Sequence, residues 1–391
     1  MDSLYKSYRY LLDNTDFPIR RKLAEVINWN DRLICICGSR GTGKTRFLLQ
    51  YAKDRFSLLD RECLYINMDN FYFTVKTLRS FAQEFIIKGG KVLLIDNILK
   101  YPDWAAELSY CYDNCPGLQI IFTNSSIMLT EKEHSLLAGK VVTYRLWGFS
   151  FREFLELQTG HTFDLYTLSD IIRNHTVIAH EIVSQIRPLA YFDDYLQEGF
   201  YHFLSGKQSF KLLKMMNRML EVDLAYISQI EQRYLPKIRK LLYLLLSTAP
   251  SALNVSQLSL DIDTSRATVM NYIKYLEDIM LVNLLYPENE EFPKKPVKLY
   301  LQNPNLLYTA NMLNINRQSL IETFFYNQLV KDYKVNATND KYCHFLIDGK
   351  YYFSVGKKII GTFNSNVYYA IDGIETGELK VIPLWLFGFL Y

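Results

Sequence analysis

The chain has 391 residues, of which 49% are hydrophobic, and its 44 basic and 41 acidic side chains leave a net charge of +3. Two or three folded domains are expected at this length, and the near balance of charge excludes a protein whose whole surface attracts nucleic acid. The first residues lack a signal-peptide core and no apolar run is long enough to span a bilayer, so we expect a cytoplasmic protein with no membrane partner. The six cysteines are expected to be reduced thiols.

Strand and helix patterns alternate from residue 1 to about residue 160. The predicted strands are the apolar runs at 33–37, 62–66, 91–95, 118–122 and 141–146. Helical patterns lie between most of these runs. Such alternation is typical of an α/β domain in which helices cover both faces of a parallel sheet.

A glycine-rich loop between the first predicted strand and the next helix matches the pattern G-x-x-x-x-G-K-[ST]. Glycines let backbone N–H groups approach phosphate oxygens, and the N-terminus of the following helix adds partial positive charge. We therefore expect Lys44 to reach the β- and γ-phosphates of a nucleotide and the Thr45 hydroxyl to ligate Mg²⁺. The residues expected to bind the nucleotide are Gly38, Arg40, Gly41, Thr42, Gly43, Lys44 and Thr45.

Helical periodicity replaces this alternation over residues 161–247, and a short helix, a capped helix at 264–277 and a hairpin ending at residue 301 follow. Helices followed by a hairpin are the order of a winged helix-turn-helix, so we expect a helical and winged-helix domain over 161–301. Basic residues on the last helix and the hairpin suit contact with DNA. The alternative is a packed spacer whose charges are solvated, and the acidic neighbours of these residues favour it. The basic residues are Arg266, Lys274, Lys294, Lys295 and Lys298.

Residues 302–391 predict a small α+β domain. A helix is expected at 319–333, short strands near 345–347 and 351–355, and an apolar closing segment at 382–391.

Several further motifs accompany the glycine-rich loop. They are LLIDN at 93–97, YPDW at 101–104, TNSS at 123–126, FSFREFL at 149–155, KPVKLYLQN at 295–303 and IETFF at 321–325. With these motifs the chain resembles, over nearly its whole length, the bacterial and archaeal AAA-type ATPases that join a P-loop domain, a winged helix and a restriction-endonuclease-like domain of unknown function. The resemblance implies ATP and Mg²⁺ as ligands, with Asp96 holding the metal through water.

Three residues near the implied catalytic site depart from the family. Asn97 stands where the family usually has a glutamate that polarises the attacking water, and an amide cannot accept the proton of that water. Asn124 replaces a glycine, and either Asn124 or Ser125 can still sense the γ-phosphate. Lys140 stands where the family usually has an arginine that is a candidate for contacting phosphate. The implied catalytic residues are therefore Asp96, Asn97, Asn124 and Lys140.

The C-terminal domain also departs from the nuclease pattern. Glu322 and Asp348 match two of the expected carboxylates, but Ser354 stands at the third position. A hydroxyl cannot replace an anionic metal ligand, so we expect a nuclease-like fold that does not cut.

Two functional hypotheses follow. In the first, the protein is an ATPase with slow or impaired hydrolysis that couples its nucleotide state to the C-terminal domains. In the second, it is a nucleotide-dependent module that binds DNA or protein and barely hydrolyses ATP. Assembly into an oligomer is compatible with both.

Overall fold

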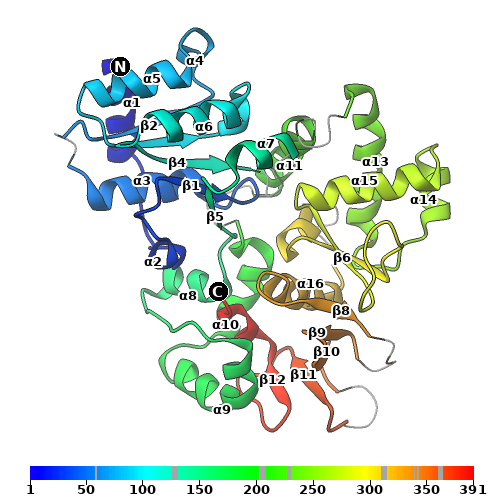
Figure 1. Cartoon of the computed structure of the whole chain (residues 1–391). Coiled ribbons are helices and arrows are strands. Elements are labelled where there is room, and N and C mark those ends of the chain that lie inside the picture. The colour runs from blue at the N-terminus through cyan, green and yellow to red at the C-terminus, as the bar shows by residue number, and fades with distance from the viewer. Residues whose placement is uncertain are drawn as a thin grey trace. The chain divides into compact units, whose positions relative to one another are not determined.

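A computed structural model describes residues 1–57, 60–125, 131–201, 208–224, 226, 230–309, 315–338, 340, 343–359 and 364–391. The chain forms two compact units, Met1–Gly148 and Phe149–Tyr391 (Figure 1). The three domains expected from the sequence, with boundaries at 160 and 301, stay a prediction. Within the described residues, no helix is both long and apolar enough to cross a membrane.

The first unit is built on a five-stranded parallel sheet with the order β2-β3-β4-β1-β5. Its strands are β1 (Leu33–Cys37), β2 (Cys63–Asn67), β3 (Val92–Asp96), β4 (Gln119–Asn124) and β5 (Val142–Arg145). All four pairings are parallel, and every residue of β1 and β3 is buried. Burial on both faces is what a parallel sheet between two helical layers requires. The predicted α/β architecture is confirmed.

Helices connect these strands along both faces of the sheet. They are α1 (Asp2–Asp13), α2 (Leu23–Val26), α3 (Lys44–Arg55), α4 (Tyr72–Val75), α5 (Leu78–Ile87), the 3₁₀ turn η1 (Ile98–Lys100), α6 (Trp104–Asn114) and α7 (Glu131–Leu137). The β1-to-β2 connection runs across the sheet in the direction opposite to the later ones. Since such crossovers are right-handed, α3 lies on one face and α5, α6 and α7 on the other. The carboxyl ends of all five strands therefore share one edge.

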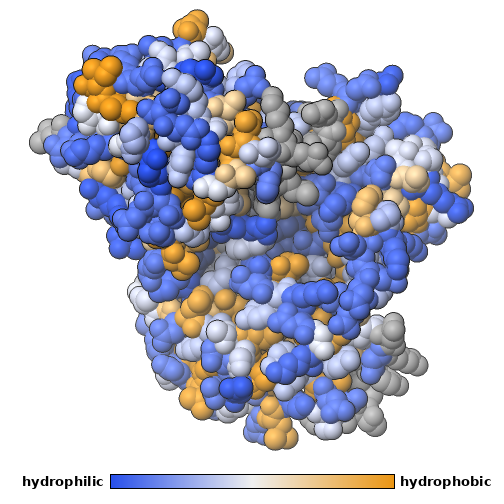
Figure 2. Space-filling model, in the orientation of Figure 1, coloured by the Kyte–Doolittle hydropathy of each residue, from blue (hydrophilic) through white to orange (hydrophobic). Residues whose placement is uncertain are grey.

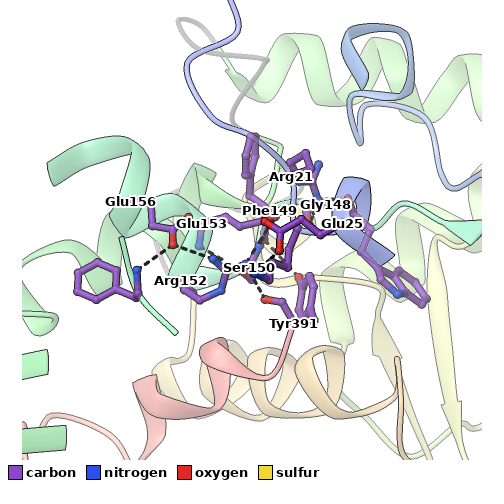
Figure 3. Close-up of polar contacts among 12 residues, drawn as sticks. Arg21, Glu25, Gly148, Phe149, Ser150, Arg152, Glu153, Glu156 and Tyr391 are labelled. Carbon is purple, nitrogen blue, oxygen red and sulfur yellow. Dashed lines mark hydrogen bonds and ion pairs between the residues drawn. The ribbon is translucent and has the colours of Figure 1, made fainter. Parts of the chain in front are cut away.

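The second unit begins with a capped helix, α8 (Phe151–Thr159). The Ser150 hydroxyl accepts a hydrogen bond from the backbone N–H of Glu153, and the Glu153 carboxylate accepts one from the backbone N–H of Ser150, each at 3.1 Å (Figure 3). In the first turn, the buried Arg152 guanidinium pairs with Glu156 at 2.8 Å. This capping box fixes where the helix starts, directly after the end of the first unit.

Helices dominate the unit up to residue 278. They are α9 (Leu168–Gln185), α10 (Leu189–Asp194), the π-helical η2 (Tyr195–Gly199), α11 (Gln208–Arg218), the π-helical η4 (Met219–Leu224), η5 (Gln232–Tyr234), α13 (Leu235–Thr248), α14 (Val255–Asp261) and α15 (Arg266–Asp278). An antiparallel hairpin of β6 (Val282–Leu285) and β7 (Lys298–Leu301) follows. Three helices followed by this hairpin match the predicted element order, and their assignment as a winged helix stays a prediction.

A second five-stranded sheet, with the order β12-β11-β10-β9-β8, closes the unit. Its elements are η6 (Pro304–Thr309), α16 (Arg317–Leu329), β8 (Val335–Ala337), β9 (Phe345–Ile347), β10 (Tyr351–Gly356), β11 (Val367–Ile371), β12 (Val381–Pro383) and η7 (Leu384–Phe389). The β8–β9–β10 pairings are antiparallel, and β10–β11–β12 are parallel. The Phe325 ring of α16 lies 5.3 Å from Phe353 and 4.8 Å from Phe387, so helix and sheet share one aromatic core.

Figure 2 shows hydrophobic residues on the visible face in small groups among hydrophilic ones. Phe71 and Val75 of the α4 region and Ile87 of α5 are among the large apolar side chains that are exposed. Scattered exposure of this kind is ordinary for a folded protein.

A buried carboxylate ties α16 to the hairpin. Glu322 accepts contacts from the Lys298 ammonium at 2.5 Å, the Tyr300 hydroxyl at 3.1 Å and the Gln318 amide at 2.9 Å. Burial opposes the charge on Glu322, but the nearby ammonium and these hydrogen bonds outweigh it and hold the pKa of Glu322 below its usual value. Such a pair is costly to break from one side, because the remaining charge loses its partner.

We expect Glu322→Gln to lower the free energy of unfolding by about 1–3 kcal/mol, since it leaves Lys298 facing a neutral amide. Because the pKa of Glu322 is lowered in the fold, its contribution is complete near neutral pH and is lost as the pH falls through the acid range. Urea unfolding at several pH values measures both effects. The exposed Glu378→Gln is the control, and equal stability of the two variants at neutral pH would refute the assignment.

Candidate functional site

The glycine-rich loop joins the carboxyl end of β1 to the first turn of α3. Gly41 and Gly43 have φ angles of 85° and 93°, in the left-handed region that glycine adopts without strain. A Cβ on Gly38 would lie 2.2 Å from the carbonyl oxygen of Leu146. The Thr42 hydroxyl donates to the Ser39 carbonyl at 3.0 Å and links the two halves of the loop. Gly38 therefore leaves no room for a side chain, and Gly41 and Gly43 hold backbone conformations that favour glycine.

Lys44 is the first residue of α3, and its ammonium folds back over the loop. It donates to the carbonyl oxygens of Gly38 at 2.6 Å and Ser39 at 2.8 Å. Arg40 lies between them and Gly41, with its side chain half-buried. The Lys44 ammonium, which is predicted to reach the nucleotide phosphates, is therefore held at the loop, beside the N-terminal end of α3.

Asp96, the last residue of β3, is buried and accepts hydrogen bonds from three hydroxyl groups. These come from Thr45 at 2.6 Å, Tyr65 at 2.8 Å and Thr123. Burial and the neighbouring carboxylate raise the pKa of Tyr65, so its phenol stays a donor. The two residues predicted to hold the metal, Thr45 and Asp96, are thus brought together.

A hydroxyl and a carboxylate are hard oxygen ligands of the kind that Mg²⁺ takes, usually together with substrate phosphates and several waters. Among the described residues there is no group of three or more His, Cys, Asp or Glu that could hold a metal ion. The donor set therefore fits Mg²⁺ bound with a nucleotide better than a resident metal held by the protein alone.

Asn97 follows Asp96 and has a φ angle of 57°, a conformation that asparagine tolerates better than most residues. Its backbone N–H donates to the Thr123 hydroxyl at 3.0 Å. Its side-chain amide donates to the carboxylate of Asp69 at 3.1 Å and to Asn67 at 3.4 Å. Asn97 therefore lies at the carboxyl edge of the sheet, beside a carboxylate from the neighbouring strand.

The two other predicted catalytic residues lie in different places. Asn124 ends β4 next to the loop, where its carbonyl accepts from the backbone N–H of Gly38 at 3.2 Å. Ser126 of the same motif lies outside the described residues. Lys140 precedes β5, which runs parallel to β1, and so lies at the opposite edge of the sheet from the loop.

The Lys140 ammonium is also already engaged, by Asp113 at 2.5 Å and the Ser109 hydroxyl at 2.8 Å. A five-residue strand spans roughly 16 Å, which separates Lys140 from the loop of the same chain. The structure therefore does not bring Lys140 to this site. Glu107 of α6, a further carboxylate to consider as a base, accepts hydrogen bonds from Arg79 through both of its oxygens.

Arg21 links the loop to the end of the first unit. Its buried guanidinium donates to the carbonyl of Thr42 at 3.1 Å and to those of Trp147 at 2.8 Å and Gly148 at 3.2 Å. Figure 3 shows Arg21 beside Gly148. Just before them, the Leu146 backbone N–H donates to the Cys37 carbonyl at 2.8 Å. The segment that leads out of the unit is thus bonded to the strand and the loop of the site.

Sequence reasoning missed Tyr65, Asn67, Asp69, Thr123 and Arg21. The polar residues at and just beyond the ends of β2 and β4 carried a signal, because ligands of parallel sheets bind outside the carboxyl ends of the strands. Arg21 carried none, since nothing in its local pattern predicts contact with residues 147 and 148.

The predicted nuclease residues do not converge. Asp348 lies in the turn that closes the β9–β10 hairpin, where it accepts from the Lys334 backbone N–H at 2.8 Å. Gln318, which bonds Glu322, also bonds the Val355 carbonyl near the other end of β10, roughly 13 Å along the strand. Ser354 alternates with Phe353 and so faces away from α16. The structure therefore does not bring Glu322, Asp348 and Ser354 together, and the nuclease-like fold stays a prediction.

The basic residues expected to meet DNA are largely paired. Lys274 bonds Glu277 at 2.8 Å and Asp278 at 3.1 Å, Lys294 bonds Glu290 at 3.1 Å, and Lys298 bonds the buried Glu322.

Two segments of the chain match known protein families. Residues 30–155 match the AAA domain family, and residues 200–319 match a domain of unknown function (DUF8612). The uncharacterized protein MJ1637 of Methanocaldococcus jannaschii is 26% identical over 290 residues, which are 70% of this chain and 61% of that protein. The chain thus spans less than two thirds of the length of this relative.

Solved structures with similarity include the replication initiator DnaA bound to AMPPCP and single-stranded DNA, with a TM-score of 0.27, 15% identity, and coverage of 70% of this chain and 86% of that one. PCH-2 of C. elegans has a TM-score of 0.25 and 15% identity, and the match covers 71% of this chain and 66% of that one. A DNA polymerase III gamma subunit-related protein of Thermotoga maritima has a TM-score of 0.26 and 10% identity, and the match covers 71% of this chain and 99% of that one. TM-scores this low carry no argument. The glycine-rich loop, the parallel sheet and the match over residues 30–155 show that the first unit resembles an AAA-type P-loop domain.

Proposed function

We propose that the protein binds ATP with Mg²⁺ through residues 38–45 and Asp96, and that it hydrolyses the nucleotide slowly. The observation that carries this proposal is the 2.6 Å hydrogen bond between Thr45 and Asp96 beside the glycine-rich loop. In this arrangement the loop and Lys44 bind the phosphates, and Thr45 and Asp96 hold the metal, which balances phosphate charge. The preference for adenine rests on the family resemblance.

Slow turnover follows from the chemistry of Asn97. An amide oxygen can orient a water molecule but cannot take its proton, and loss of a general base costs roughly 10²–10⁴-fold in rate. Asn124, whose carbonyl accepts from the backbone N–H of Gly38, is proposed to sense the γ-phosphate. Lys140 is proposed to contact phosphate only in an oligomer, where the nucleotide is held by a neighbouring subunit.

Coupling to the C-terminal part of the chain is proposed to run through Arg21. A change in the loop on nucleotide binding moves the Thr42 carbonyl, and the same guanidinium holds the carbonyls of Trp147 and Gly148. Because one rigid, planar guanidinium holds both groups, a shift of the Thr42 carbonyl is expected to move the carbonyls of Trp147 and Gly148 as well. The C-terminal domain is proposed to be nuclease-like in fold and inactive in cleavage, because the Lys298 ammonium already neutralises Glu322.

The second candidate function is a nucleotide-dependent binding module with little or no hydrolysis, which the neutral Asn97 favours. Protein is the better-supported partner for such a module, because most of the basic residues on the proposed winged helix are paired with carboxylates. Paired charges add little to phosphate binding.

Lys44→Ala is expected to weaken Mg²⁺–ATP binding by about 10- to 150-fold, since it removes a charge-assisted contact worth about 1.5–3 kcal/mol. Isothermal titration measures the affinity directly. Lys53→Ala, in the last turn of the same helix, is the matched control and should bind as the parent does. Absence of any heat of binding in the parent would exclude the proposal.

Asn97→Glu is expected to raise steady-state phosphate release by about 10- to 100-fold, because it supplies a group that accepts the proton of the attacking water. The assay is run over a range of protein concentrations, so that a contribution from a neighbouring subunit is included. Asn97→Asp keeps a residue that suits the left-handed backbone and should show a smaller gain. An unchanged rate in both variants would show that the missing carboxylate does not limit turnover.

Arg21→Ala is expected to uncouple residues 146–152 from the nucleotide. In the parent, Mg²⁺–ATP should alter amide hydrogen exchange in this segment, and in the variant the nucleotide should still bind without that change. Arg21→Lys should give a partial response, because one ammonium cannot replace the planar fork. The neighbouring Arg20→Ala, which removes only an exposed pair with Asp54, is the control. A parental response in Arg21→Ala would contradict the coupling route.

A further inference from the structure

Hydrolysis of ATP at this site is faster when a group takes a proton from the attacking water, and neither Asn97 nor the nearby Glu107 of α6 can serve as that group. Asn97 is a neutral amide, and Glu107 is engaged by Arg79 through both of its oxygens. Asp96 already accepts three hydroxyl hydrogen bonds and is the proposed metal ligand. A different carboxylate at the same edge of the sheet meets the requirement.

That carboxylate belongs to Asp69, two residues beyond the end of β2. The strand register pairs Asn67 with Asp96, and the Met68 backbone N–H donates to the Asp96 carbonyl at 3.0 Å. The chain then turns, because the Asp69 backbone N–H donates to the Asn67 side chain at 2.8 Å. These bonds deliver Asp69 to the side of Asn97 from the neighbouring strand.

The side chains of Asp69 and Asn97 are directly bonded. The Asn97 amide donates to Oδ2 of Asp69 at 3.1 Å, and the Lys100 ammonium lies 3.7 Å from Oδ1. With its N–H₂ group turned toward Asp69 and Asn67, Asn97 presents its amide oxygen as an acceptor. The Asp69 side chain is 41% exposed, so water reaches it.

We propose that Asp69 is the general base of this site and that Asn97 orients the water that Asp69 deprotonates. This inference rests on the proposed ATP hydrolysis. The water oxygen forms a bond to the γ-phosphorus while its proton passes to the Asp69 carboxylate. The bond between the γ-phosphorus and the β,γ-bridging oxygen breaks, and ADP keeps that electron pair. The proton then leaves Asp69 to the released phosphate or to solvent.

The two residues thus share a task that one glutamate after the metal-binding aspartate performs in the resembled family. The amide supplies direction, and the carboxylate supplies basicity from an adjacent strand. Because a water must fit between two side chains, the arrangement is less compact than a single glutamate, which agrees with slow rather than absent turnover.

Asp69→Asn separates a catalytic role from a structural one. The asparagine keeps an oxygen that accepts the hydrogen bond of Asn97, so the position of Asn97 is retained, but it cannot accept a proton. Phosphate release should fall by about 100-fold or more, while the affinity for Mg²⁺–ATP changes by less than about twofold. Asp69→Ala should lose a similar share of the rate, and Asp69→Glu should keep more of it than either.

Asp60→Asn is the matched control, because Asp60 is exposed and precedes β2 at the opposite edge of the sheet. A parental rate in Asp69→Asn would overturn the inference and leave Asp69 as a support for Asn97. Phosphate release by the parent no greater than by Lys44→Ala would also overturn it, while ATP binding would stand. A parent that binds no nucleotide would remove both the proposed function and this inference.

Discussion

The site depends on the hydrogen bonds that hold the Asp96 carboxylate at the end of β3. Three hydroxyls, from Thr45, Tyr65 and Thr123, surround one buried anion, and they come from α3 and the two strands that flank β3. A buried charge is tolerated only when it is satisfied in this way. The bond from Thr45 also ties the glycine-rich loop to the end of β3, where Asn97 follows Asp96.

The two units treat buried charge differently. In the first, the three side-chain donors to Asp96 are neutral hydroxyls. In the second, Glu322 is neutralised by the Lys298 ammonium within the chain. A lysine ammonium has no lone pair to offer a metal while it is charged, and its presence removes the attraction for one. This contrast explains in physical terms why we assign chemistry to the first unit and a packing role to the carboxylate of the second.

Residues close together in sequence were predictable, and contacts between distant segments were not. The alternating apolar runs predicted the parallel sheet, and Thr45 of the loop pattern is hydrogen-bonded to Asp96. Lys140 was expected at the phosphates from its place in a motif, but the parallel direction of β5 puts it at the opposite edge, paired with Asp113. The roles of Arg21 and Asp69 depend on which segments fold against the loop and on strand register, and local periodicity does not encode either.

The central claim is that Asp96 and Thr45 form the metal half of an ATP site. Titration of a non-hydrolysable ATP analogue, with Mg²⁺ and with EDTA, tests it in the parent and in Asp96→Asn. We predict that Mg²⁺ tightens binding in the parent, that Asp96→Asn loses this gain, and that both proteins bind the metal-free analogue equally. An undiminished gain from Mg²⁺ in Asp96→Asn would contradict the account.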